Sequence, residues 1–200
     1  MISLEEAKAA QAEMHAQGQR LLKAVPLEAL FSTYGRYVIG GSFKHGLMVL
    51  SKPDIDGYIV TEKTSFDDGI KLLGGLFKLQ EVRRVAIERE PDGSAELKVK
   101  VPFEGRLWNL DVHFCESGNL SSYDYLGHVR YTPEQANLML LIKAQLAEQG
   151  LYPGSTKLPG SLSSVDVYEA VIEHGVETTD EAIAWAKGHE THADRFRAEH

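Results

Sequence analysis

Residues 38–60 read VIGGSFKHGLMVLSKPDIDGYIV and decide the fold. In this stretch an apolar run ends at Gly41-Ser42, a basic turn follows, and an Asp-Ile-Asp triplet occupies positions 54–56. A glycine-containing turn that opens a short helix points free backbone N–H groups toward one place, and such a place binds anions. The stretch therefore predicts a strand, a phosphate-binding turn, a short helix that continues to residue 50, and a second strand.

The two aspartates of the triplet predict a cation site. In an extended strand, side chains two positions apart lie on the same face, so Asp54 and Asp56 point the same way while Ile55 points into the core. Two carboxylates about 4 Å apart repel each other by roughly 4 kcal/mol at an effective dielectric constant of 20, so such a pair indicates a bound cation. Oxygen ligands favour a hard ion, Mg²⁺ above all.

Length and composition indicate a globular protein. The 200 residues, of which 43% are hydrophobic, are enough for one domain with a substantial core or for a domain with a small appendage. We expect a sheet-containing part with N-terminal helices over residues 1–130 and a helical part over residues 131–200. No apolar run approaches the roughly 18 residues of a membrane span, and the single cysteine, Cys115, excludes an internal disulfide. We therefore expect a cytoplasmic protein without a membrane partner.

The negative charge is concentrated near the C-terminus. The formal net charge is −8, and residues 160–200 contribute nine acidic against three basic side chains. Residues 36–106 hold twelve basic and eleven acidic side chains, and two of these acids are Asp54 and Asp56. With a divalent ion bound to those two aspartates, the middle of the chain is mildly positive. The overall charge therefore does not exclude a nucleic acid partner.

The hydrophobic pattern predicts an α/β (α+β) fold, in which helices back a mixed, mostly antiparallel sheet and the C-terminal part is helical. A Gly/Pro/Ser-rich segment, 150–163, is the one linker-like stretch. The pattern predicts helices over 4–24, 27–34, from 65, 133–149, 164–174 and 179–187, and strands over 37–40, 54–61, 82–89, 96–103 and 106–115.

A third carboxylate lies on the last of these strands. Apolar residues alternate with polar ones from residue 106 to residue 115, so one face of the strand is anchored in the core. The other face carries Asn109, Asp111 and His113. Asp111 therefore stands on the polar face of a well-anchored strand, where it is a candidate to join the carboxylates at 54 and 56.

These residues resemble the motif of the nucleotidyltransferases related to DNA polymerase beta. The pattern of that superfamily is a Gly-Ser pair, a spacer of about ten residues, an Asp-x-Asp strand and a third carboxylate on a later strand. In this chain Gly41-Ser42, Asp54, Asp56 and Asp111 match it. The run GSFKHG at residues 41–46 is more narrowly similar to the corresponding turn of family X DNA polymerases.

The resemblance implies the transfer of a nucleotide from an NTP or dNTP to a hydroxyl group, with release of pyrophosphate. It implies two Mg²⁺ ions, for which Mn²⁺ can substitute, held by Asp54, Asp56 and Asp111, the last of which binds the ion that activates the acceptor. It also implies that Ser42 and nearby N–H groups bind the β- and γ-phosphates, and that Lys44 neutralises the triphosphate.

The acceptor stays open at this point. The leading interpretation is a compact polymerase of family X with palm and thumb only, acting on a nucleic acid primer and template. The alternative is a minimal nucleotidyltransferase that modifies a small molecule, a protein or tRNA. A second alternative is a nucleotide-binding module without catalytic activity. His45 and His113 are candidates for positions next to the metal and phosphate ligands rather than for ligands themselves.

Overall fold

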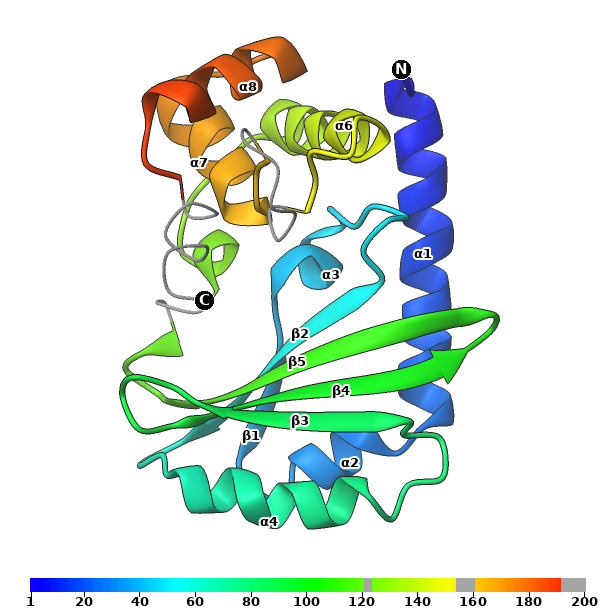
Figure 1. Cartoon of the computed structure of the whole chain (residues 1–200), viewed down its shortest axis with the longest axis vertical. Coiled ribbons are helices and arrows are strands. Elements are labelled where there is room, and N and C mark those ends of the chain that lie inside the picture. Colours follow the sequence, from blue (N-terminus) through cyan, green and yellow to red (C-terminus); the bar gives the residue numbers. More distant parts are fainter. Residues whose placement is uncertain (121–123, 154–160, 192–200) are drawn as a thin grey trace. The chain divides into compact units, whose positions relative to one another are not determined.

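The computed structural model describes residues 1–120, 124–153 and 161–191 (Figure 1). The chain divides into two compact units. The first comprises Met1–Glu13, Leu47–Lys52 and Val129–His200, and the second comprises Met14–Gly46 and Pro53–His128. The domain boundary near residue 130 stays a prediction.

The second unit contains a five-stranded sheet in the order β1-β2-β5-β4-β3. Strands β2 and β5 are parallel, and the other three neighbouring pairs are antiparallel. The predicted mixed, mostly antiparallel sheet is thus confirmed. The strands are β1 (Arg36–Ile39), β2 (Asp54–Thr61), β3 (Arg84–Arg89), β4 (Ala95–Phe103) and β5 (Arg106–Glu116).

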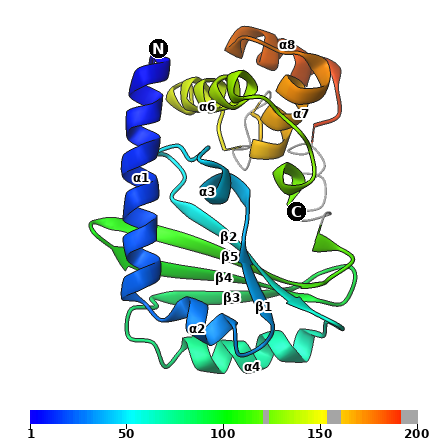
Figure 2. The ribbon, with the colours of Figure 1, turned by 180° about the vertical axis from the view of Figure 1, so that it is seen from behind.

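Helices α2 (Leu27–Phe31) and α4 (Phe66–Leu76) lie along one face of this sheet (Figures 1 and 2). The face beneath them is apolar because every second residue of each strand points toward it. The fully buried side chains of this core include Phe31, Leu72, Leu97, Val99, Trp108, Leu110, Val112 and Phe114. The alternation therefore leaves the polar residues of β2, β4 and β5 on the opposite face.

That opposite face carries a small apolar cluster of its own. Tyr58, Val60 and Cys115 are buried there, and the partly buried Val38 and Leu120 pack against them. Burial raises the pKa of the Cys115 thiol to about 11, so the thiol is protonated at neutral pH and acts as a core residue. The cluster covers one end of the polar face.

Helix α3 (Gly41–His45) connects the end of β1 to the following loop, and it is shorter than predicted. The sequence predicted a helix to residue 50, but Gly46 has a left-handed backbone with φ of 67° and forms the C-cap. Glycine adopts this conformation without steric cost, so it ends the helix there. The predicted helix was too long because Gly46 ends the helix, although the residues that follow it are apolar.

The part of the chain after residue 131 is helical in its described residues, as predicted, and the first unit also contains the start of one N-terminal helix. The helices of this unit are the start of α1 (Leu4–Ala24), α6 (Pro133–Glu148), α7 (Ser164–His174) and α8 (Thr179–Gly188). Thr132, Ser163 and Thr178 each begin a helix with a reciprocal capping box. Residues 154–160 of the predicted linker lie outside the described residues. Among the described residues, no helix has both the length and the apolar character needed to cross a membrane.

A buried lysine on α6 connects three segments of this helical unit. The side chain of Lys143 on α6 is fully buried, and its ammonium donates to the Leu47 carbonyl at 2.7 Å and to the Tyr168 hydroxyl at 3.0 Å. The same ammonium lies over the rings of Tyr152 and Tyr168, at 5.3 and 5.1 Å from their centroids. These contacts stabilise a charge that burial alone would make costly.

Candidate active site

The structure brings the three predicted carboxylates together on the polar face of the sheet. Asp56 on β2 lies directly opposite Asp111 on β5, because these parallel strands are in register at these positions. Asp54 lies two residues before Asp56 on the same face of β2 and is buried, with 3% of its surface exposed. One carboxylate oxygen from each residue lies within 4.8 Å of the others.

This arrangement fits a divalent cation. Two carboxylates within 4.8 Å of each other repel by at least about 3.5 kcal/mol at an effective dielectric constant of 20, and a third increases the cost. A hard divalent ion removes the repulsion and is bound best by carboxylate oxygens. Asp54 is also shielded from bulk water, which strengthens its interaction with an ion. The donor set therefore suits Mg²⁺ or Mn²⁺.

The turn before α3 packs directly against one of these carboxylates. The N–H of Gly40 donates to the backbone carbonyl of Asp56 at 3.0 Å, which ties the turn to β2. Gly41 has a positive φ of 58°, and a Cβ atom at this position would lie 1.9 Å from Oδ2 of Asp56. Both the backbone angle and the close contact require glycine here. The Gly-Ser pair is thereby placed beside the carboxylates, as the sequence suggested.

Helix α3 is anchored by its first turn. Ser42 and Phe43 are buried, and the Phe43 ring contacts the His15 ring with centroids 4.7 Å apart. A Cβ atom on Gly18 of α1 would lie 2.4 Å from this ring, so α1 approaches it closely. Lys44 is the next residue, and its side chain is 43% exposed. The anchored phenylalanine thus holds in place the short helix that carries Ser42 and Lys44.

Asp124 is a site residue that the sequence did not reveal. Its carboxylate is buried, and it accepts a hydrogen bond from Lys44 Nζ at 3.2 Å and from the Gly41 N–H at 3.4 Å. His45 Nε2 lies 3.8 Å from the same carboxylate. Local sequence gives no signal for this role, because Asp124 lies outside the Gly-Ser and Asp-x-Asp motifs.

The two candidate histidines lie near the site and favour the neutral form. Burial lowers the pKa of His45, an effect that the nearby Asp124 opposes. Burial also lowers the pKa of His113, which lies opposite Tyr58 in the β2–β5 register with the two rings stacked 6.0 Å apart. Neither histidine belongs to the group formed by Asp54, Asp56 and Asp111.

A second group of potential ligands lies along the same face. Glu90, Glu96 and His113 each offer one ligand atom within 4.8 Å of the others, and His113 Nε2 lies 3.6 Å from Glu96. The ammonium of Lys98, 3.2 Å from Glu96, already neutralises part of this group. Burial raises the pKa of both glutamates, with Lys98 opposing the shift of Glu96. This group therefore needs a metal ion less than the three aspartates do.

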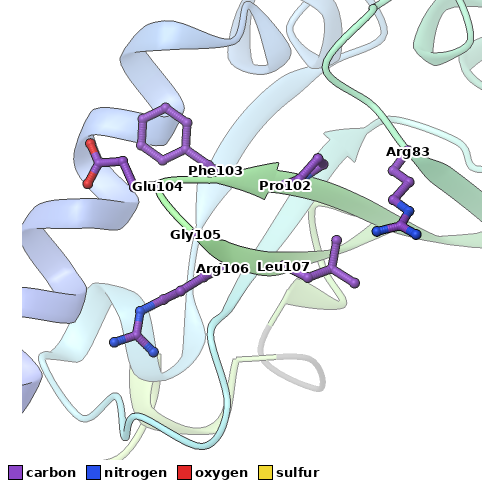
Figure 3. A pocket seen from close by; sticks show the side chains of 7 residues that line it. All are labelled: Arg83, Pro102, Phe103, Glu104, Gly105, Arg106 and Leu107. Atoms are coloured by element: carbon purple, nitrogen blue, oxygen red, sulfur yellow. The ribbon is translucent and has the colours of Figure 1, made fainter.

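A separate pocket of about 370 Å³ lies at the turn between β4 and β5 (Figure 3). Figure 3 shows its side chains spread along the hairpin rather than converging on one point. Arg20 binds the Glu104 carboxylate in a two-point contact of 2.8 and 2.6 Å, which fastens the turn to α1. The pocket is lined by Arg83, Pro102, Phe103, Glu104, Gly105, Arg106 and Leu107, so the three aspartates are not part of it.

No protein-family model matches the chain, and no curated protein matches it. Solved structures do. The Cid1 RNA terminal uridylyl transferase aligns over 86% of this chain and 47% of its own, with 17% identity and a TM-score of 0.52. The Cid1 poly(U) polymerase bound to MgATP aligns over 82% and 51%, with 16% identity and a TM-score of 0.57. The fold is that of a nucleotidyltransferase.

A third solved structure agrees with this assignment of the fold. The complex of the non-canonical poly(A) polymerase GLD-2 with GLD-3 aligns over 86% of this chain and 58% of the matched chain, with 16% identity and a TM-score of 0.57. The chain thus spans about half the length of the solved proteins it matches. At this level of identity the likeness shows the fold alone, and the narrower resemblance to family X DNA polymerases stays a prediction.

Proposed function

We propose that this protein is a metal-dependent nucleotidyltransferase that adds a nucleotide from an NTP to the 3′-hydroxyl of an RNA and releases pyrophosphate. The observation that carries the proposal is the convergence of Asp54, Asp56 and Asp111 beside the Gly41-Ser42 turn. The solved structures that share the fold are described as a terminal uridylyl transferase, a poly(U) polymerase and a poly(A) polymerase. These descriptions favour RNA as the acceptor.

Asp54, Asp56 and Asp111 would hold two Mg²⁺ ions, for which Mn²⁺ can substitute. When bound, such ions polarise the phosphoryl oxygens and lower the pKa of the attacking hydroxyl. Asp54 and Asp56 lie on one strand and would serve both ions, while Asp111 approaches from β5 and would serve the ion next to the acceptor. The rigid parallel pair of β2 and β5 fixes the spacing between them.

The turn would bind the triphosphate. Backbone N–H groups at Gly41 and Ser42, the Ser42 hydroxyl and the Lys44 ammonium form the donors of a phosphate cradle, by which we mean these three residues. Donors of this kind stabilise the negative charge that moves to the leaving pyrophosphate. Lys44 acts as a point charge and not as the two-pronged donor that an arginine would be.

The acceptor would approach from the far side of the carboxylates. An in-line displacement places the attacking and leaving oxygens on opposite sides of the α-phosphorus. The phosphate cradle follows β1, so the acceptor side is that of β4 and β3. In the register of these strands Arg84, Lys100 and Asn109 form a row that ends at Asp54. This basic row can bind the phosphates of an RNA 3′ end.

On the other side of Asp111, the next row of paired residues across the sheet is acidic. Glu88, Glu96 and His113 lie in line across β3, β4 and β5, and Lys98 binds both glutamates at 2.7 and 3.2 Å. Repulsion from the two glutamates disfavours a phosphate chain there. The difference in charge between the two rows favours a polyanionic acceptor that enters over Arg84 and Lys100. A neutral small molecule would not require such a basic row.

Two other functions follow from the same site. A compact DNA polymerase of family X would use the same carboxylates with dNTPs and a primed template. A module without catalytic activity would bind Mg²⁺ and a triphosphate but transfer nothing. The presence of all three carboxylates at one place favours an enzyme. The activities named for the solved structures with the same fold favour RNA over DNA.

The test is nucleotide addition to a labelled RNA. The purified chain is incubated with Mg²⁺, each of the four NTPs and a single-stranded oligonucleotide, and products are resolved on a denaturing gel. Parallel reactions contain dNTPs with a gapped DNA duplex. We expect longer RNA products with at least one NTP, and no extension of the DNA. DNA extension without RNA extension would support the family X alternative and contradict our proposal.

Substitution of Asp111 connects the activity to the site. Asp111→Asn keeps the size of the side chain but removes a metal-binding charge, and we expect a loss of about 10³-fold in rate, because metal stabilisation of the transition state is worth several kcal/mol. The matched control is Asp67→Asn, which removes the same charge from an exposed residue in the first turn of α4. Equal activity of the two variants would refute the assignment.

A further inference from the structure

Asp124 occupies donors that the proposed function needs for the nucleotide. Its carboxylate accepts from the Gly41 N–H at 3.4 Å and from Lys44 Nζ at 3.2 Å, and His45 Nε2 lies 3.8 Å away. Two of these groups belong to the phosphate cradle. The carboxylate is an anion whose two oxygens accept from a backbone N–H and an ammonium, which are donors that a bound phosphate would also use.

The surroundings of Asp124 are shaped to hold this carboxylate. Only 4% of the residue is exposed. A Cβ atom on Gly40 would lie 3.2 Å from its carboxylate, and one on Gly127 would lie 2.6 Å from Oδ2. The backbone of Asp124 is also fastened, since its N–H donates to Leu120 and its carbonyl accepts from Gly127. Two glycines therefore make room for one acidic side chain against the cradle.

We propose that Asp124 is an internal counter-anion of the phosphate cradle and sets its affinity for triphosphate. The inference rests on the proposed function, because it assumes that the cradle receives the phosphates. The Gly41 N–H carries a single hydrogen, so it cannot donate fully to a carboxylate and a phosphate oxygen at once. The Lys44 ammonium has three N–H donors and can turn from one anion to the other.

An incoming anion must compete with the Asp124 carboxylate for these donors. A triphosphate with its metal offers several oxygens and displaces the carboxylate, whereas inorganic phosphate offers fewer contacts and competes poorly. Repulsion between the buried carboxylate and the leaving pyrophosphate also favours product release. Asp124 thus lowers the affinity of the cradle for every anion and in this way sets its affinity for triphosphate.

Calorimetry with inorganic tripolyphosphate and Mg²⁺ tests the inference without any nucleotide transfer. The full chain is compared as wild type and as Asp124→Asn, in which a neutral amide of the same size replaces the carboxylate. We expect the variant to bind tripolyphosphate about tenfold more tightly, equivalent to ~1.4 kcal/mol. Inhibition of the transfer reaction by pyrophosphate should strengthen by a similar factor. Asp67→Asn should leave both quantities unchanged.

A second variant keeps the charge but moves it. Gly127→Ala places a methyl group 2.6 Å from Oδ2 of Asp124, so the carboxylate has to shift, and Gly127 has no positive φ that would make alanine strained. We expect this variant also to bind tripolyphosphate more tightly, by a smaller factor than Asp124→Asn. It serves as the test if Asp124→Asn does not reach the wild-type melting temperature.

The outcomes separate this inference from the proposed function. Affinity of either folded variant for tripolyphosphate that is equal to or weaker than that of the wild type would overturn the role of Asp124, whatever the transfer activity. Tighter binding by the variants together with an absence of transfer to RNA would support the counter-anion and contradict the proposed reaction. Failure of all forms to bind tripolyphosphate would contradict both.

Discussion

Substitution of Gly41 by alanine disturbs the candidate site at one defined point. The residue has φ of 58°, and the added Cβ would lie 1.9 Å from Oδ2 and 2.7 Å from Cγ of Asp56. Two effects follow. The left-handed backbone is unfavourable for alanine, and the methyl group pushes against a carboxylate that we assign to the metal.

The two effects have different magnitudes and different readouts. Backbone strain of this kind costs about 1 to 2 kcal/mol, which lowers the melting temperature of a protein of this size by about 2 to 4 °C per kcal/mol. Ordinary contact between carbon and oxygen begins near 3.4 Å, so the methyl group and the carboxylate must separate by roughly 1.5 Å. A displacement of about 1 Å in a catalytic group can reduce the rate about 10²-fold.

Gly105→Ala is the matched control. Gly105 also has a positive φ, 76°, but an added Cβ there would meet nothing within 4 Å. Thermal melting and RNA extension are measured for both variants. We expect similar losses of stability, and a loss of rate of about 10²-fold for Gly41→Ala alone. Full activity of a folded Gly41→Ala variant would refute the placement of this turn against the metal carboxylate.

Three further predictions concern other parts of the chain. Burial lowers the pKa of His45 in the folded protein, so protonation of His45 favours unfolding. The contribution of neutral His45 to the free energy of unfolding is therefore fully present above the unfolded-state pKa of about 6.5 and is lost as the pH falls below it. Urea denaturation between pH 7.5 and 5.5 should show a weaker pH dependence in His45→Gln, and parallel curves would contradict this. Replacement of Arg84 and Lys100 by glutamine should weaken RNA binding. The slope of the logarithm of the binding constant against the logarithm of the salt concentration should decrease in magnitude by about 1.4, as expected for the loss of two phosphate contacts on a single strand. An unchanged slope would show that the RNA binds elsewhere. Lys143→Met should lower the free energy of unfolding by about 2 kcal/mol, because the Leu47 carbonyl and the Tyr168 hydroxyl lose a buried donor, and a variant as stable as the wild type would show that these contacts contribute little.

The sequence was sufficient to predict which face each carboxylate would occupy. The two-residue spacing placed Asp54 and Asp56 on one face of β2, and the alternation along β5 placed Asp111 on its polar face. In the structure β5 has this alternation of buried and less buried residues. The sequence could not predict that β5 pairs with β2 in parallel, with Asp56 opposite Asp111. Strand order depends on long-range packing, which leaves no periodic pattern in the chain.

The remaining features of the site depend on contacts between distant segments. Asp124 reaches the turn at Gly41 from a position 83 residues later in the chain, and nothing in its local sequence separates it from an exposed acidic residue. The grouping of Glu90, Glu96 and His113 likewise requires knowledge of the β4–β5 register. The length of α3 was mispredicted for a local reason, since Gly46 ends the helix before the apolar residues that follow it.

The most direct test of the central claim is anomalous diffraction from crystals soaked with Mn²⁺ and a non-hydrolysable NTP. We expect Mn²⁺ peaks at coordination distance from the carboxylates of Asp54, Asp56 and Asp111, with the triphosphate at Gly41 and Ser42. Peaks at Glu90, Glu96 and His113 alone, or an absence of metal beside the three aspartates, would contradict it.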